Sequence, residues 1–165
     1  MKIREIEVKD NQAMEEIIKR SLESFELDIP GTAYFDPQLG ELAQFYAQEK
    51  GASYWVAVNE AEEVVGGVGI ASFDREQQVC ELQKLYVKPE YQGQGIAVKL
   101  ISVALEFAEK HYDYCYLETS KKLEAANRLY SWFGFDQLDQ PFGQSSHFTM
   151  DAWYMKDLRQ GKDKS

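Results

Sequence analysis

The segment 79-VCELQKLYVKPEYQGQGIAVKLISVA-104 decides how the rest of the chain folds. Residues 79–87 have the composition of a strand, residues 88–90 break it, and a turn containing Gly93 and Gly95 leads into a helical pattern. A glycine-containing turn that opens a helix leaves several backbone N–H groups unpaired at the positive end of the helix dipole. The segment therefore predicts a phosphate-binding site at residues 92–98.

Composition predicts a single domain at residues 1–158, followed by a charged, flexible tail at 159–165. Of the 165 residues, 44% are hydrophobic and 13% aromatic, which suffices for one core. The formal net charge of −10 disfavours nucleic acid and anionic membranes as partners, since both attract clustered Lys and Arg. No apolar run approaches the length of a membrane span, and Cys80 and Cys115 lack metal-ligand spacing. We expect a cytoplasmic protein with buried free thiols and no metal.

The whole pattern predicts an α+β fold with the order βααβββαβαββ around one mixed, mostly antiparallel sheet of about seven strands flanked by helices. Short polar turns join the strands at 53–59, 64–73 and 79–87, so these three should be antiparallel. A helix separates the strand at 79–87 from the next one, so those two should be parallel neighbours. The other strands are expected from residue 3 to near 10 and at 114–118, 135–138 and 147–158, and the helices at 11–25, 39–46, 96–111 and 123–133.

The same residues exclude two other phosphate-binding motifs. No Gly-Lys-Ser/Thr occurs anywhere, so the chain has no Walker loop. A dinucleotide fingerprint would need a third glycine where Val98 stands and a strand that runs directly into the turn, whereas residues 88–92 separate the two. The glycines of the run 66-GGVG-69 lie inside a strand, where glycine indicates a bulge or a close backbone approach.

The runs 85-LYV-87 and 92-QGQGIA-97, with a proline between them, resemble the central motif of the GNAT family of N-acetyltransferases. That motif is Gln/Arg-x-x-Gly-x-Gly/Ala, and Gln92, Gly95 and Ala97 match it. The later run 126-ANRLY-130, followed by Gly-Phe at 134–135, resembles the second signature of the family. The resemblance covers roughly residues 3–158 and implies a GNAT-like single domain.

Acetyl-coenzyme A is the acyl donor that this resemblance implies. Backbone N–H groups from Gly93 to about Val98 would hold its pyrophosphate, and the glycines let the chain approach it closely. In the family the pantetheine arm pairs with the main chain of a bulged strand, which implies Leu85 and Val87 as backbone partners. The residues expected to bind the coenzyme are Leu85, Tyr86, Val87, Gln92, Gly93, Gln94, Gly95, Ile96, Ala97 and Asn127.

Acetylation of an amine needs a base for the amine proton, donors for the oxyanion and an acid for the leaving thiolate. Glu81 is the candidate base, because strand alternation places it on one side with Gln83 and lets it face the cleft; the alternative is a solvated strand acid. The resemblance implies the N–H of Val87 as an oxyanion donor. It also implies that Tyr130 protonates the coenzyme sulfur, the alternative being a core aromatic.

On the acceptor side, the loop at 26–38 contains Tyr34, Phe35 and Asp36, which could face the substrate or form a solvated connection in which Asp36 caps the next helix. Glu118 and Thr119 end a strand beside the cleft and could bind an ammonium group or cap a helix. His147 is an alternative base, or a structural histidine at the start of the last strand.

These residues predict direct transfer of an acetyl group to a primary amine within a ternary complex, because none is placed as an obvious acyl carrier. A small amine or polyamine is the first expectation for the acceptor, and a protein lysine or N-terminal amine the second. An acyl-coenzyme A-binding sensor or scaffold without turnover is the alternative from another class. A homodimer stays open.

Overall fold

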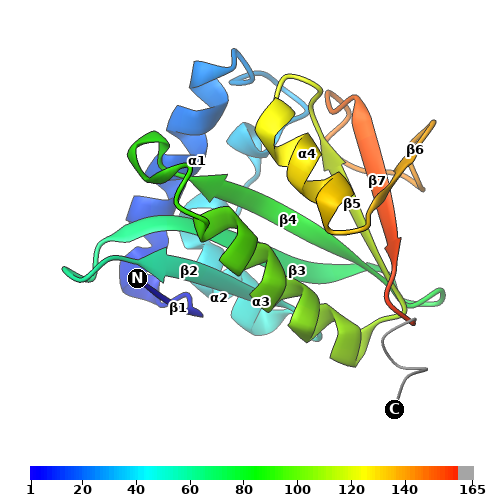
Figure 1. The fold of residues 1–165 in the computed structure, drawn as a ribbon, viewed down its shortest axis with the longest axis horizontal. Coiled ribbons are helices and arrows are strands. Elements are labelled where there is room, and N and C mark those ends of the chain that lie inside the picture. Colours follow the sequence, from blue (N-terminus) through cyan, green and yellow to red (C-terminus); the bar gives the residue numbers. More distant parts are fainter. Residues whose placement is uncertain (160–165) are drawn as a thin grey trace.

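One seven-stranded sheet runs through the computed structural model, which describes residues 1–159 (Figure 1). The strands are β1 (Lys2–Glu5), β2 (Ser53–Val58), β3 (Val64–Asp74), β4 (Val79–Val87), β5 (Tyr114–Thr119), β6 (Asp136–Leu138) and β7 (Ala152–Asp157). The helices are α1 (Asn11–Ser24), α2 (Leu42–Gln48), α3 (Ile96–His111) and α4 (Glu124–Trp132). The strands lie side by side in the order β1-β2-β3-β4-β5-β7-β6. The predicted α+β class and element order are confirmed.

Helices cover both faces of the sheet, with α3 and α4 on one face and α1 and α2 on the other (Figure 1). On the first face, Leu100 and Ala104 of α3 pack in one core with Ile70 of β3, as their helical spacing requires. On the second face, Met14 and Ile18 of α1 belong to a separate core. Because both faces are covered, β2 is buried along its whole length.

The sheet opens between β4 and β5. These strands are parallel, as predicted, but they pair only where residues 79–81 lie beside residues 114–116. Beyond that point β5 continues alongside β7, which pairs with it from Tyr114 to Thr119. Beyond Glu81, one edge of β4 therefore has no partner strand among the described residues, and the two strands splay apart (Figure 1).

A β-bulge interrupts β4 at this open edge. Gln83 pairs with Gly69 and Tyr86 with Gly67, so two residues of β4 lie opposite the single residue between those glycines. Lys84, inside the bulge, has a φ of 51°, a left-handed conformation that few non-glycine residues adopt.

The extra residue changes the face to which alternate side chains of β4 point. On the face of α3 and α4 lie Cys80 and Leu82 before the bulge and Leu85 and Val87 after it. On the opposite face lie Gln83, bonded to α2, and Tyr86, which packs against the core of α1 and α2. Glu81 shares that face by strand alternation. One strand therefore serves two different sites.

Two strand boundaries differ from the sequence expectation by several residues. The first strand ends at Glu5, and the last one begins at Ala152 instead of His147. Residues 139–151 instead form an irregular loop that lies against the loop at 26–38, where Thr149 N donates to Gly31 O at 3.1 Å. At the start of the expected tail, Arg159 bonds Asp157 at 2.9 Å; the rest of that tail lies outside the described residues. Among the described helices, none is long and apolar enough to span a membrane.

Candidate active site

The turn before α3 has the conformation that phosphate binding requires. Gly93 and Gly95 both have a φ of +79°, a region in which side chains are strained, and Gly95 is the N-cap residue of α3. A Cβ built on either glycine would meet no atom within 4 Å, so this side of the turn is open. The first N–H groups of α3 have no intrahelical partner and carry the positive end of its dipole. The turn can therefore bind an anion without a Lys or Arg side chain.

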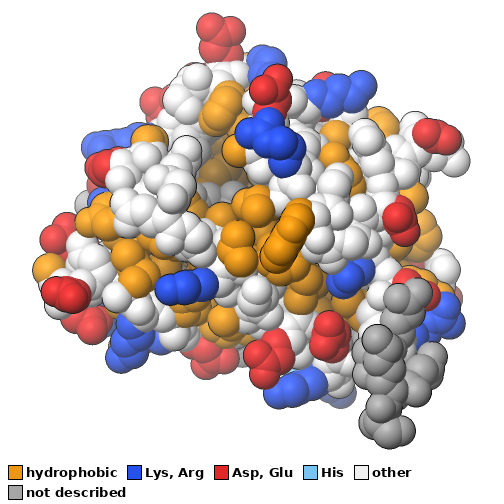
Figure 2. All heavy atoms as spheres, viewed as in Figure 1, with side chains coloured by type: hydrophobic (Ala, Val, Ile, Leu, Met, Phe, Trp, Pro, Cys, Tyr) orange, Lys and Arg blue, Asp and Glu red, His pale blue; other side chains and the backbone are white. Residues whose placement is uncertain are grey.

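A groove of about 310 Å³ extends from this turn along the end of β4 to α4. Figure 2 shows a hollow in this region with hydrophobic side chains along it. Its lining contains no Lys or Arg among the described residues. Of the residues predicted to bind the coenzyme, all except Gln94 and Asn127 line the groove. The side chain of Gln92 fixes the turn to the strand, because its Nε2 donates to Val87 O at 3.1 Å.

Glu81 is the last residue of β4 that pairs with β5, and the two strands separate after it. The Nε2 of Gln83 donates to its Oε1 at 2.7 Å. Burial and the nearby charge of Glu118 raise the pKa of Glu81 to about 7, against the lowering effects of the Gln83 hydrogen bond, His147 and Lys84. A carboxyl group with a pKa near neutrality is suited to accept a proton at physiological pH.

Glu118 lies on the same face of the sheet as Glu81. Tyr116 of β5 pairs with Glu81, and Glu118, two residues further along β5, points to the same face as Tyr116. The hydroxyl of Tyr116 donates to Oε2 of Glu118 at 3.0 Å. Its other oxygen, Oε1, is buried and has no hydrogen-bond partner within residues 1–159. A buried carboxylate oxygen without a donor is costly, so this atom is ready to accept a hydrogen bond from a ligand.

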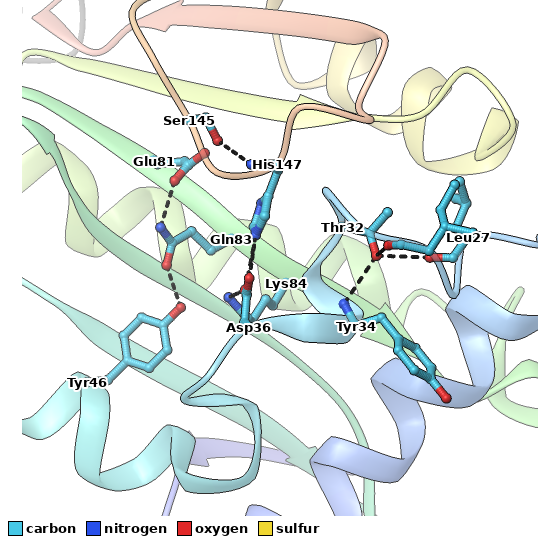
Figure 3. A network of polar contacts seen from close by, with 11 residues as sticks. Leu27, Thr32, Tyr34, Asp36, Tyr46, Glu81, Gln83, Lys84, Ser145 and His147 are labelled. Atoms are coloured by element: carbon cyan, nitrogen blue, oxygen red, sulfur yellow. Dashed lines mark hydrogen bonds and ion pairs between the residues drawn. The ribbon is translucent and has the colours of Figure 1, made fainter.

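Asp36 ties two loops to the bulge of β4 (Figure 3). Its carboxylate lies 2.7 Å from Nζ of Lys84 and 2.9 Å from Nε2 of His147. Burial raises the pKa of Asp36, but the hydrogen bonds and charges of His147 and Lys84 outweigh it and hold the pKa below its usual value. The loops at 26–38 and 139–151 are thus joined beside Glu81. The helix-cap alternative for Asp36 is wrong, because Glu41 is the N-cap residue of α2, Gln38 is that of the 3-10 turn before it, and no side chain caps either.

Tyr130 is buried on α4 and packs against Phe135 and Tyr154. Burial, together with the neighbouring hydroxyls of Tyr86 and Tyr154, raises its pKa, so the phenol stays protonated at neutral pH. Tyr130 is therefore a buried core aromatic with a protonated hydroxyl, and its role as proton donor to the coenzyme sulfur stays a prediction.

Asn127 has its amide group committed within the protein. Its Nδ2 donates to the carbonyl oxygens of Ser120 and Leu123 at 3.0 and 2.7 Å, and its Oδ1 accepts from the hydroxyl of Tyr154 at 2.7 Å. These bonds fasten the start of α4 to β7. The structure thus gives Asn127 a structural task, away from the groove lining.

The structure brings together Glu81, Glu118, Asp36 and His147, but not the other acceptor-side candidates. Tyr34 donates to Glu23 of α1 at 3.3 Å, and Phe35 is exposed. Thr119 is buried and faces away from Glu118 by strand alternation. The helix-cap alternative for Glu118 and Thr119 is wrong, because the N-cap residue of α4 is Leu123 and no side chain caps that helix.

Sequence reasoning gave no functional role to three residues of this cluster, namely Tyr46, Gln83 and Lys84. Gln83 and Lys84 stand next to each other in an otherwise alternating strand, and two adjacent polar residues are a signal for a bulge. Tyr46 carries no such signal, since a buried helical tyrosine is indistinguishable from other core residues. Among residues 1–159, no group of His, Cys, Asp and Glu could hold a metal ion.

Comparisons with known proteins agree with this geometry. The sequence profile of the Acetyltransferase (GNAT) family matches residues 12–135. "Uncharacterized N-acetyltransferase YjgM" of Escherichia coli (strain K12) is 38% identical over 159 residues, which is 94% of this chain and 94% of that protein. The chain therefore belongs to the GNAT family of acetyltransferases.

Solved structures share the fold. An acetyltransferase of the GNAT family from Staphylococcus aureus Mu50 matches with a TM-score of 0.82 at 24% identity, over 95% of this chain and 98% of that one. A GNAT superfamily phosphinothricin acetyltransferase from Sinorhizobium meliloti, in complex with AcCoA, matches with a TM-score of 0.73 at 20% identity, over 95% and 88%. At these identities the likeness concerns the fold alone, and a fold by itself does not select a substrate.

Proposed function

We propose that this protein transfers an acetyl group from acetyl-coenzyme A to a primary amine, by direct transfer within a ternary complex. The observation that carries the proposal is Glu81, a carboxyl group with a pKa raised to about 7. It lies at the point where β4 and β5 separate, and so beside the unpaired edge of β4.

The residues present fit acetyl-coenzyme A, which supplies an activated acetyl thioester. The N–H groups of the turn at 92–98 would bind the pyrophosphate, and the apolar groove suits the pantetheine arm. The free edge of β4, with the main chain of Leu85 and Val87, would pair with that arm in the manner of an added strand.

In the reaction, Glu81 accepts a proton from the substrate ammonium group and leaves a neutral amine. The amine nitrogen then bonds to the acetyl carbon and gives up its second proton to water, and the carbon–sulfur bond breaks with its electron pair moving to sulfur. The N–H of Val87 stabilises the oxyanion, and Tyr130 donates its proton to the thiolate. The raised pKa of Tyr130 keeps its hydroxyl protonated before the transfer, and water returns the proton to it afterwards.

The acceptor that we propose is a small amine or a polyamine. The net charge of −10 and the unpaired Oε1 of Glu118 support a cationic substrate, with Glu118 as the group that binds an ammonium. We also propose a cytoplasmic location, supported by Cys80 and Cys115, which are buried free thiols on paired strands.

The test is thiol release from acetyl-coenzyme A with a panel of monoamines, diamines, polyamines and a lysine-containing peptide. We expect turnover with at least one small amine. Glu81→Gln should lower kcat about 100- to 10,000-fold. Tyr130→Phe should also lower kcat. Neither substitution should change the affinity for the coenzyme. Glu76→Gln, at an exposed turn, is the matched control.

Three outcomes would contradict the proposal or its assigned roles. Coenzyme binding without thiol release for any amine would identify a binding module in place of an enzyme. Turnover with the peptide alone would replace the small amine by a protein acceptor. Full activity of both Glu81→Gln and Tyr130→Phe would remove the assigned roles.

A further inference from the structure

We propose that Tyr46 and Gln83 form a positioning pair that holds the Glu81 carboxylate in one orientation for proton transfer. This inference rests on the proposed function, in which Glu81 is the base. It concerns two residues that neither touch the coenzyme groove nor belong to any motif of the sequence.

The three side chains form a chain of hydrogen bonds, with Gln83 between the other two (Figure 3). The hydroxyl of Tyr46 donates to Oε1 of Gln83 at 2.5 Å, and Nε2 of Gln83 donates to Oε1 of Glu81 at 2.7 Å. The polarity of this chain is fixed chemically, because an ionised carboxylate only accepts and an amide donates only through its nitrogen. Tyr46 must therefore donate to the amide oxygen.

Tyr46 can reach Gln83 because a glycine lies between them. Gly69 of β3 pairs directly with Gln83 of β4. A Cβ built on Gly69 would stand 2.8 Å from the hydroxyl oxygen of Tyr46 and 2.7 Å from the ring of Tyr54. The glycine thus lets the Tyr46 side chain cross β3, which explains the close approach that a glycine inside a strand indicates.

The pair is rigid at its outer end. Tyr46 is 3% exposed and packs against the ring of Tyr54, with 5.2 Å between centroids. Burial, followed by the charges of Glu81 and Asp36, raises its pKa well above the ordinary value, so the hydroxyl stays protonated and keeps donating. The amide of Gln83 is therefore held with its nitrogen towards Glu81.

The consequence for Glu81 is both geometric and electrostatic. Binding Oε1 stops rotation of the carboxylate and leaves Oε2 for the amine. The donated hydrogen bond favours the ionised form, as do the charges of His147 and Lys84, whereas burial and Glu118 oppose it. Without the pair, the base would rotate and its pKa would rise.

The test uses Gln83→Met, which keeps the size of the side chain but donates no hydrogen bond. The pKa of Glu81 is measured by NMR of ¹³C-labelled glutamate carboxyl groups, and kcat is measured from pH 5.5 to 9. We expect the pKa to rise by about one unit, a typical effect of one hydrogen bond to a carboxylate. We also expect kcat to fall about tenfold at pH 7 and to stay about threefold low at pH 9, because ionisation does not restore orientation.

Tyr46→Phe removes a single oxygen and should act in the same direction with a smaller effect. If the two residues act as one unit, the double variant should be no worse than Gln83→Met alone, whereas separate structural defects would add. The matched control is Tyr112→Phe, which removes a tyrosine hydroxyl bonded to Gly51 O and should leave the pKa of Glu81 unchanged.

An unchanged pKa of Glu81 and an unchanged pH profile in Gln83→Met would overturn the inference while leaving the proposed function standing. Failure of the proposed function gives a different result, either no thiol release with any amine or full activity of Glu81→Gln. The NMR titration needs no turnover, so it tests the pair in either case. If Gln83→Met does not fold, Tyr46→Phe supplies the same measurement.

Discussion

The coenzyme groove and the acceptor side of the site lie along the same strand but differ in chemistry. The groove is lined mainly by apolar side chains and backbone, and it needs only the bulge to turn Leu85 and Val87 towards it. The acceptor side is a network of charged and polar groups around Glu81. The groove offers shape and N–H groups, which suit a long anionic ligand. The acceptor side offers carboxylates with altered pKa values, which suit proton transfer from a cation.

The two regions also differ in how the chain assembles them. Most of the groove comes from the continuous segment 85–97 and the start of α4. The acceptor side joins β4 to residues from two loops, α2 and β5, namely Asp36, Tyr46, Glu118 and His147. The first region depends on local sequence and the second on tertiary structure, so substitutions should separate them.

The largest effect is expected in the groove, for Gly95→Glu compared with Gly95→Gln. Both variants bear the same cost of a side chain at φ +79°, and neither meets an atom within 4 Å of its Cβ, so both should fold. Only the glutamate repels the pyrophosphate. Two like charges about 4 Å apart near a surface cost about 4 kcal/mol, so coenzyme affinity should fall about 1,000-fold.

Isothermal titration with coenzyme A measures this difference, and circular dichroism checks the fold. Equal affinities for the two Gly95 variants would mean that the turn does not face the phosphates. The proposed position of the amine site relative to the groove would then have to be revised.

On the acceptor side, Glu118→Gln should raise the KM for the preferred amine about tenfold with less than about a twofold change in kcat. The substitution removes the negative charge proposed to bind the ammonium group, whereas the amide oxygen of the glutamine can still accept the hydrogen bond from the Tyr116 hydroxyl. Coenzyme affinity should not change. A fall in kcat at constant KM would instead assign Glu118 to the chemical step. Amine binding and proton transfer would then not be carried out by separate residues.

The smallest effect is on stability. The pKa of Glu81 is raised from 4.5 to about 7 in the folded state, so its contribution to stability is fully present below about pH 4.5 and is lost as the pH rises through about 7. Glu81→Gln stays neutral and should be more stable than the wild type at pH 8 by about 1 to 3 kcal/mol.

Thermal unfolding at pH 4.5 and pH 8 measures this difference. The gain should be close to zero at the lower pH and roughly 3 to 8 °C at the higher one. A gain of equal size at both pH values would mean that the substitution acts through packing and not through the charge. Glu76→Gln should show no gain at either pH.

The fold could be predicted because its signals are local. Strand, turn and helix follow one another in residues 79–104, and the parallel pairing of β4 and β5 follows from the helix between them. The expected strand at His147 failed for a tertiary reason. His147 bonds Asp36 and Thr149 bonds Gly31, so this segment folds over the loop at 26–38 and cannot join the sheet.

The acceptor side could be predicted only in part. Glu81 follows from strand alternation up to the bulge. The link from Tyr46 to Gln83 depends on the register that sets Gly69 opposite Gln83, and that register cannot be obtained from composition or spacing. The role of Lys84 could not be predicted for the same reason, because its side chain reaches Asp36 from inside the β-bulge.

The short contact between β4 and β5 has a consequence for how a coenzyme arm would bind. Only residues 79–81 and 114–116 pair the two strands, so hydrogen bonds join β1–β4 to β5–β7–β6 along a narrow seam, while one hydrophobic core packs against both parts. A coenzyme arm lying against β4 would act as a removable strand at this seam. The arm would then extend the hydrogen bonding of β4 beyond Glu81, where β4 and β5 do not pair.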